Sequence, residues 1–142
     1  LYERVFNNGI PFLGICVGLQ LLADYGHENI INTPGLGWLS GEVKKICPKD
    51  NNYKVPHMGW NSLKFDKDHP LIKRLSPEID MYFVHSYHFD LCEVNDRIAH
   101  VEYSGDITAI AAKNNICGTQ FHPEKSQQAG QTFIENFMDW SP

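Results

Sequence analysis

An apolar run over residues 10–15 is followed, after one cysteine, by an apolar stretch over residues 17–25 that has polar positions on one face. This pattern predicts a short buried strand and then an amphipathic helix. Cys16 lies at the bend, with Gly14 and Gly18 on either side. We expect a Cβ at either glycine to collide with the neighbouring backbone in so tight a turn. We also expect the helix N-terminus to lower the pKa of the Cys16 thiol.

Short alternating segments dominate the middle of the chain. Alternation predicts strands over residues 41–46, 62–65, 81–87, 98–103, 107–112 and 116–121. Residues 26–41 are rich in glycine, proline and asparagine and are predicted to be a loop, and residues 55–61 to be irregular. One or two helical turns are expected over residues 69–75, and helical spacing of apolar residues predicts a closing helix over residues 127–140.

The order of these elements predicts an α/β fold. A length of 142 residues suits one domain, which we expect to span residues 1–142. The chain has no initiator Met, and residues 1–6 read as the end of a helix leading into the first strand. We therefore expect this chain to be the C-terminal part of a domain whose opening βα units are missing.

Net charge, cysteine spacing and the lengths of the apolar runs argue against several classes of function. A net charge of −5 and the lack of long basic runs argue against a nucleic-acid partner. The four cysteines show no spacing typical of a structural zinc site or a disulfide framework, which indicates a reducing, cytoplasmic setting. The sequence has no run of about 18 apolar residues, the length needed to span a membrane. We do not expect Arg4 and the apolar run to form a signal peptide, because Ile15 is larger than the small residue that a cleavage site needs.

Candidate chemistry centres on Cys16 and on His122-Pro-Glu124. A cysteine between two glycines at a strand-to-helix bend is typical of a nucleophile elbow. Residues 122 and 124 leave an extended segment on the same face. Glu124 can then orient His122 while His122 takes the thiol proton, which is the arrangement of a catalytic triad. The alternatives are a buried structural cysteine, a histidine at a strand end and a solvated surface carboxylate.

Three further sites carry weaker signals. Gln20 lies one helical turn after Cys16 on the same face, which favours contact with substrate over a surface amide. His85, Ser86 and Tyr87 end a predicted strand, where ligands bind in open α/β sheets, although His85 is as readily structural. Residues 54–61 hold Met58 and Trp60, which suit a protein interface or packing under a loop.

Four motifs give the chain a family resemblance. Residues 14–20 (Gly-Ile-Cys-Val-Gly-Leu-Gln) and residues 120–126 (Gln-Phe-His-Pro-Glu-Lys-Ser) resemble the class I, or triad, glutamine amidotransferases. Residues 54–61 (Lys-Val-Pro-His-Met-Gly-Trp-Asn) and residues 82–87 (Tyr-Phe-Val-His-Ser-Tyr) are similar to the glutaminase subunit of imidazole glycerol phosphate synthase. The resemblance covers essentially the whole chain. It implies the flavodoxin-like three-layer fold of that family.

The resemblance also implies a reaction. Cys16, His122 and Glu124 would hydrolyse glutamine to glutamate and ammonia, with the Val17 N–H and one N–H from a missing N-terminal loop holding the oxyanion. Substrate would be held by Gln20, Ser86 and Tyr87, the last two largely through backbone groups. Neither a metal nor an organic cofactor is needed.

The resemblance implies a partner as well. Ammonia would pass to a cyclase subunit that makes imidazole glycerol phosphate in histidine biosynthesis, in a heterodimer. The segment that faces this subunit would include Met58, Trp60 and Asn61. Two alternatives remain open, namely a related subunit that serves a nucleotide-sugar amidating synthase and a catalytically silent binding module.

Overall fold

A five-stranded sheet forms the middle layer of the molecule, in the order β1-β11-β10-β9-β6. The computed structural model describes residues 1–28 and 32–142. The strands are β1 (Phe12–Ile15), β6 (Lys64–Phe65), β9 (Arg97–Glu102), β10 (Asp106–Lys113) and β11 (Ile116–Thr119). β1 runs parallel to β11 with Ile15 opposite Thr119, while the other pairs are antiparallel. The first strand and the last therefore end side by side.

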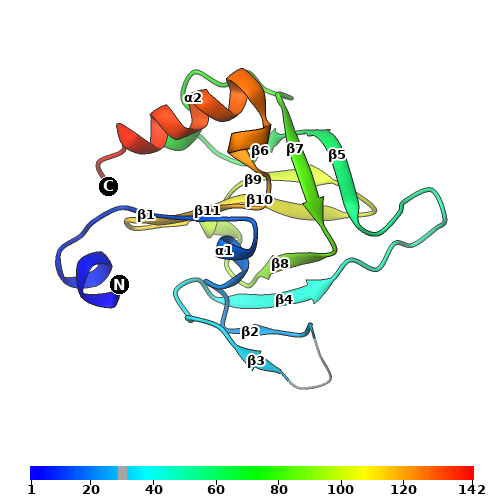
Figure 1. Cartoon of the computed structure of the whole chain (residues 1–142), viewed down its shortest axis with the longest axis horizontal. Helices are drawn as coiled ribbons and strands as arrows, with labels where there is room; N and C mark the ends of the chain where they lie inside the picture. Colours follow the sequence, from blue (N-terminus) through cyan, green and yellow to red (C-terminus); the bar gives the residue numbers. More distant parts are fainter. Residues whose placement is uncertain (29–31) are drawn as a thin grey trace.

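Two smaller sheets and two helices flank this layer (Figure 1). One sheet has the order β3-β2-β4-β8, and β5 pairs with β7 in the other. Their bounds are β2 (Tyr25–Gly26), β3 (Thr33–Pro34), β4 (Gly41–Lys45), β5 (His57–Ser62), β7 (Asp80–His85) and β8 (Tyr87–Leu91). The helices are α1 (Val17–Gln20) and α2 (Gln127–Met138). A π-helical turn, Glu3–Asn7, and three 3₁₀ turns, Pro70–Ile72, Val94–Asp96 and Pro123–Lys125, complete the described elements.

Hydrophobic cores lie on both faces of the middle layer. Ile110 and Cys117 pack in one core with Phe133 of α2. Ala111 and Ile116, their neighbours in sequence, pack in the other core with Leu19 of α1. Because successive residues of a strand point to opposite faces, an almost wholly apolar β10 and β11 can serve both cores. α2 consequently covers one face, while α1 and the β4 sheet cover the other (Figure 1).

Most predicted elements are present, but four predictions differ from the structure. The first helix ends at Gln20 instead of residue 25. Residues 57–62 form strand β5, so the prediction of an irregular segment over residues 55–61 is wrong. The strand predicted over residues 81–87 is two strands separated at Ser86. The loop predicted over residues 26–41 contains the short strands β2 and β3, and its residues 29–31 lie outside the described part of the chain.

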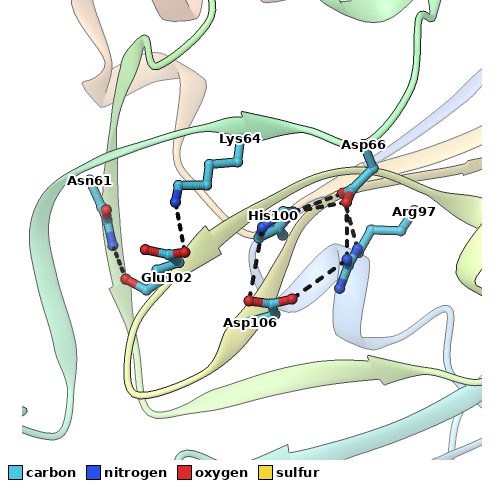
Figure 2. Close-up of polar contacts among 7 residues, drawn as sticks. All are labelled: Asn61, Lys64, Asp66, Arg97, His100, Glu102 and Asp106. Atoms are coloured by element: carbon cyan, nitrogen blue, oxygen red, sulfur yellow. Dashed lines mark hydrogen bonds and ion pairs between the residues drawn. The ribbon is translucent and has the colours of Figure 1, made fainter.

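An ionic cluster fastens the short edge strand β6 to the sheet (Figure 2). Arg97 donates two hydrogen bonds of 3.0 Å to the Asp66 carboxylate, which also bonds His100 Nδ1 at 3.0 Å. Lys64 Nζ lies 2.6 Å from Glu102 Oε1 on the neighbouring strand. A paired, bidentate arginine of this kind adds specificity of register as well as energy. We assign the cluster a role in holding β6 and β9 together.

In the described part of the chain, none of the helices has both the length and the apolar character needed to cross a bilayer.

Candidate active site

Cys16 lies at a sharp bend between β1 and α1. Its backbone has φ 52° and ψ −105°, a conformation that side chains rarely adopt, and its N–H donates to the Thr119 carbonyl at 2.7 Å. A Cβ added at Gly14 would come within 2.4 Å of the Gly18 carbonyl oxygen, so Gly14 is required as predicted. A Cβ at Gly18 would meet nothing within 4 Å, so the prediction of a collision there is wrong.

The Cys16 thiol is half-buried between an acceptor and a donor. Sγ lies 4.0 Å from the Val84 carbonyl and receives a hydrogen bond of 3.6 Å from Gln120 Nε2. Burial raises the pKa of the thiol above its usual value, and the Val17 N–H and the Gln120 amide oppose this shift without reversing it. The prediction of a lowered pKa is therefore wrong. A single turn of helix does not offset the loss of water around the sulfur.

His122 and Glu124 form the predicted pair. His122 Nδ1 lies 2.7 Å from Glu124 Oε1, and the imidazole is 18% exposed while the carboxylate is 56% exposed. Partial burial raises the pKa of the Glu124 carboxyl group, but the hydrogen bond to His122 and the nearby Lys125 charge outweigh this effect, and the net pKa lies below its usual value. An ionised carboxylate only accepts hydrogen bonds, so His122 carries its proton on Nδ1 and leaves Nε2 free.

Cys16 and the His122–Glu124 pair, the members of the candidate triad, reach the same edge of the sheet. Cys16 follows β1, and His122 follows β11 by three residues, so the parallel pairing of these strands brings them to neighbouring ends. The Glu124 carboxylate is near enough to raise the pKa of Cys16 by electrostatic repulsion. In residues 1–28 and 32–142 no hydrogen bond joins the thiol to His122. Catalytic contacts of this type often form only when substrate is bound.

Backbone groups of β7 hold the histidine segment in place. The His122 N–H donates to the Tyr82 carbonyl at 2.9 Å. Ser126 Oγ accepts from the Tyr82 N–H at 2.9 Å and donates to the His122 carbonyl at 2.7 Å. β7 thus touches both halves of the site, because its Val84 carbonyl also lies against the thiol. Local sequence patterns carried no sign of these main-chain contacts.

Gln20 faces the thiol side of α1, as predicted, and is tied into a chain of amides. Its Nε2 donates to the Tyr87 carbonyl at 2.9 Å and to Gln120 Oε1 at 3.1 Å. Gln120, which is fully buried, connects Gln20 to the thiol. Sequence reasoning did not single out Gln120. The available signal was a polar residue in a buried apolar run, two positions before His122.

Ser86 separates β7 from β8, and Tyr87 is the first residue of β8, where its carbonyl bonds this chain of amides. The Ser86 carbonyl accepts from the Ile46 N–H at 2.9 Å. The Tyr87 carbonyl accepts from both Gln20 and His85 Nδ1, the latter at 2.7 Å. Their predicted contact with substrate stays a prediction. It cannot use the Tyr87 carbonyl, which already has two donors.

His85 belongs to a buried pair of histidines. Its Nε2 lies 2.9 Å from His57 Nδ1, and Asn61 Nδ2 lies 3.2 Å from His57 Nε2. Burial is the main cause that lowers the pKa of each imidazole to about 4, and for His57 the neighbouring His85 contributes to that shift. Both rings are consequently neutral near pH 7. His85 is thus a buried structural residue, and His57, which sequence reasoning overlooked, is its partner.

The predicted interface residues divide between two faces of β5. Met58 and Trp60 are exposed, at 61% and 49%. Asn61 points the other way, because its amide also donates to the Glu102 carbonyl at 3.2 Å (Figure 2). Trp60 packs edge-on against Tyr82, whose carbonyl holds His122. The exposed face of β5 therefore lies only one strand away from the candidate site.

The other cysteines differ from Cys16 in setting. Cys117 is buried in the core beside α2, and burial raises its pKa to about 12, so it stays an inert thiol. Cys47 and Cys92 are exposed.

Comparison with known proteins agrees with this geometry. The family model "Glutamine amidotransferase class-I" matches residues 1–140. The chain is 49% identical to the imidazole glycerol phosphate synthase subunit HisH of Cereibacter sphaeroides, over 99% of this chain and 66% of that protein. It is 55% identical to the subunit of the same name from Rhodospirillum rubrum, over 93% of this chain and 62% of that protein. The chain thus spans slightly less than two thirds of these relatives.

Solved structures show the same fold. A glutamine amidotransferase from Thermotoga maritima superposes with a TM-score of 0.63 at 23% identity, over 96% of this chain and 50% of that one. Another solved glutamine amidotransferase superposes with a TM-score of 0.64 at 17% identity, over 96% of this chain and 65% of that one. The family model, which matches nearly every residue, establishes that the chain belongs to the class I glutamine amidotransferases.

Proposed function

We propose that this chain hydrolyses the side-chain amide of glutamine and supplies the ammonia to a synthase subunit. The observation that carries the chemistry is the 2.7 Å contact between His122 and Glu124, at the sheet edge where Cys16 bends out of β1. The similarity to proteins named imidazole glycerol phosphate synthase subunit HisH supports a particular acceptor. We infer a heterodimer with a cyclase that forms imidazole glycerol phosphate in histidine biosynthesis, located in the cytoplasm.

The positions of the protons on Cys16 and His122 support nucleophilic catalysis. Burial keeps Cys16 protonated at rest, so a base must accept its proton before it attacks. His122 Nε2 is the free imidazole nitrogen because Nδ1–H donates to Glu124. The thiolate then attacks the carboxamide carbon, and the Val17 N–H stabilises the oxyanion. His122 gives its proton to the leaving nitrogen, ammonia departs, and a glutamyl thioester remains on Cys16.

Hydrolysis of the thioester completes the cycle. Water attacks the thioester carbonyl while His122 Nε2 accepts a proton from it. The C–S bond breaks, glutamate leaves and the proton returns to Cys16. No atom beyond glutamine and water is consumed, and the three residues return to their starting state.

Substrate positioning falls to Gln20 in this proposal. Both donors of its amide are used, by Tyr87 and Gln120, and no described residue donates to its Oε1. Oε1 can therefore accept from the α-ammonium group of glutamine. We infer that Ser86 and the backbone around Tyr87 hold the carboxylate end. The exposed Met58 and Trp60 would contact the synthase subunit, one strand from the site of ammonia release.

The test is glutamate release from glutamine by the full-length protein, first alone and then with the cyclase together with the ribonucleotide substrate of that cyclase. The proposal expects turnover that requires Cys16 and that increases when the loaded cyclase is present. A Cys16→Ala variant is the control. Turnover that depends on Cys16 but ignores the cyclase would contradict the pathway and point to another synthase, such as one that amidates nucleotide sugars. Absence of turnover under all conditions would contradict the enzyme assignment and indicate a binding module.

A further inference from the structure

We propose that Gln120 is a positioning residue for the nucleophile, whose buried amide holds the Cys16 thiol and aims a hydrogen-bond donor at its sulfur. Gln120 is 0% exposed, and its Nε2 lies 3.6 Å from Sγ. Its backbone N–H donates to the Ala109 carbonyl at 2.9 Å, so the amide extends from a fixed strand end. The inference rests on the proposed function, because it takes Cys16 as the nucleophile.

The Tyr87 carbonyl fixes which end of the Gln120 amide faces the sulfur. A carbonyl oxygen only accepts, so Gln20 must present its NH₂ group to Tyr87, at 2.9 Å. The same NH₂ group lies 3.1 Å from the Gln120 amide, which must therefore present its oxygen. The remaining NH₂ group of Gln120 then points at Cys16. Reversing the Gln120 amide would place two NH₂ groups against each other.

A second set of donors fixes the Tyr87 carbonyl itself. His85 Nδ1 donates to it at 2.7 Å, and His85 Nε2 accepts from His57 Nδ1 at 2.9 Å. Asn61 donates to His57 Nε2 at 3.2 Å. Each imidazole is thus neutral with its proton on Nδ1. The hydrogen bonds run in one direction, from Asn61 through the two imidazoles to the Tyr87 carbonyl. The orientation of Gln120 is therefore determined by groups that cannot reverse without breaking this buried network.

The hydrogen bond from Gln120 matters because the thiol also lies near a hydrogen-bond acceptor. The Val84 carbonyl, at 4.0 Å, is an acceptor and favours the protonated thiol. The Gln120 NH₂ group is a donor and favours the thiolate. Without Gln120 the sulfur would keep only the carbonyl and the short α1 turn as polar surroundings. The nucleophile would then ionise less readily and would be free to rotate away from substrate.

The experiment is the pH dependence of Cys16 alkylation by iodoacetamide in the full-length protein, followed by the mass of the peptide that contains Cys16. Gln120→Met removes the amide at similar volume. We expect the titration midpoint of the thiol to rise by about one unit, since hydrogen bonds to charged groups are worth roughly that much. Gln120→Glu, which replaces the donor by a carboxylate of the same shape, should raise the midpoint at least as far. Midpoints equal to that of the wild type in both variants would overturn the proposal.

A matched control separates positioning from general loss of stability. Asn136 is another buried amide, 4% exposed, whose Nδ2 donates to the Leu71 carbonyl at 3.0 Å and which makes no hydrogen bond to the thiol. Asn136→Leu should lower stability without moving the alkylation midpoint. If Gln120→Met fails to fold, Gln20→Met tests the same hydrogen-bonded amides, because loss of the Gln20 amide leaves the Gln120 amide free to rotate. A midpoint unchanged in Gln20→Met and in Gln120→Glu would then count against the proposal.

Different results would contradict the proposed function and the proposed role of Gln120. Glutamine turnover that survives Cys16→Ala would overturn the proposed function, whatever the alkylation profile shows. Turnover that requires Cys16, combined with unchanged midpoints in the Gln120 variants, would leave the glutaminase proposal standing and remove Gln120 from it.

Discussion

Individual residues at the bend have unequal roles, which the sequence symmetry of Gly14 and Gly18 conceals. Gly14 lies against the α1 backbone, where a Cβ would be 2.4 Å from a carbonyl oxygen. The Cβ direction of Gly18 is open. The spacing around Cys16 correctly predicted the strand, the bend and the helix, but could not tell which glycine is sterically required. That difference depends on the path of α1 across β1, which is a tertiary feature.

Substitution of the two glycines should therefore give opposite results. Gly14→Ala should lower the free energy of unfolding by about 1–3 kcal/mol or prevent folding, because backbone must move to admit the methyl group. Gly18→Ala should leave it unchanged or raise it by up to about 1 kcal/mol, since alanine is the better helix former. Urea unfolding of both variants measures the contrast. Equal destabilisation by the two would contradict the structure of the bend.

Among the elements, those with strong local periodicity were predicted and those fixed by distant contacts were not. β4, β9, β10, β11 and α2 lie close to their predicted positions. α1 stops early because the carbonyls of Leu21, Leu22 and Ala23 accept N–H groups from residues 36–39 instead of continuing the helix. β5 was missed because Pro56 and Gly59 interrupt its pattern, although it pairs with β7 over six residues. Such pairing is invisible to local sequence patterns.

The residues of the candidate site divide in the same way, into those that local sequence patterns indicate and those that depend on distant contacts. Cys16, His122, Glu124 and Gln20 could be proposed as site residues from the sequence, because spacing and local motif indicate them, and their roles stay predictions. Gln120 and His57 could not be, because their importance lies in hydrogen bonds that join β5 to β7 and the residue after β11 to α1 and Cys16. The predicted low pKa of Cys16 failed for a related reason. Burial of the thiol, which raises its pKa, depends on tertiary contacts such as that of the Val84 carbonyl of β7 with the sulfur.

The His57–His85 pair connecting β5 to β7 makes stability dependent on pH. Both folded-state pKa values are about 4, below the ordinary value of 6.5. The stabilisation from neutral burial is therefore complete above about pH 6.5 and is lost as the pH falls toward 4. For one histidine this is on the order of 3 kcal/mol. The free energy of unfolding should fall over this range in the wild type, and fall less steeply in His57→Phe.

His57→Phe keeps the aromatic stacking on Phe83 while removing one titrating group of the pair. Chemical denaturation at a series of pH values between 4 and 8 measures the slope. Identical slopes for the wild type and His57→Phe would contradict the assignment of a neutral buried pair.

On the scale of the whole molecule, the candidate site and the exposed face of β5 are adjacent. Trp60 is 49% exposed and packs on Tyr82, which holds His122. Large exposed aromatic residues are typical anchors of protein interfaces. If this face docks the synthase subunit, Trp60→Ala should weaken the heterodimer by about 2 kcal/mol, or roughly 30-fold in Kd. Isothermal titration calorimetry measures this change.

Val94 supplies the matched control. It is an apolar residue with 69% exposure in the 3₁₀ turn before β9, outside β5 and β7. Val94→Ala should leave the Kd unchanged. A larger loss of affinity in Val94→Ala than in Trp60→Ala would contradict β5 as the docking face.

The central claim is that Cys16 carries the acyl group during glutamine hydrolysis. The most direct measurement is mass spectrometry of the full-length protein, quenched in acid during steady-state incubation with glutamine and the proposed synthase partner. The account predicts one glutamyl group bound through a thioester to the peptide that contains Cys16, released as glutamate by hydroxide and absent from Cys16→Ala. Turnover by the wild type without any adduct on this peptide, together with undiminished glutamate release by Cys16→Ala, would contradict the account.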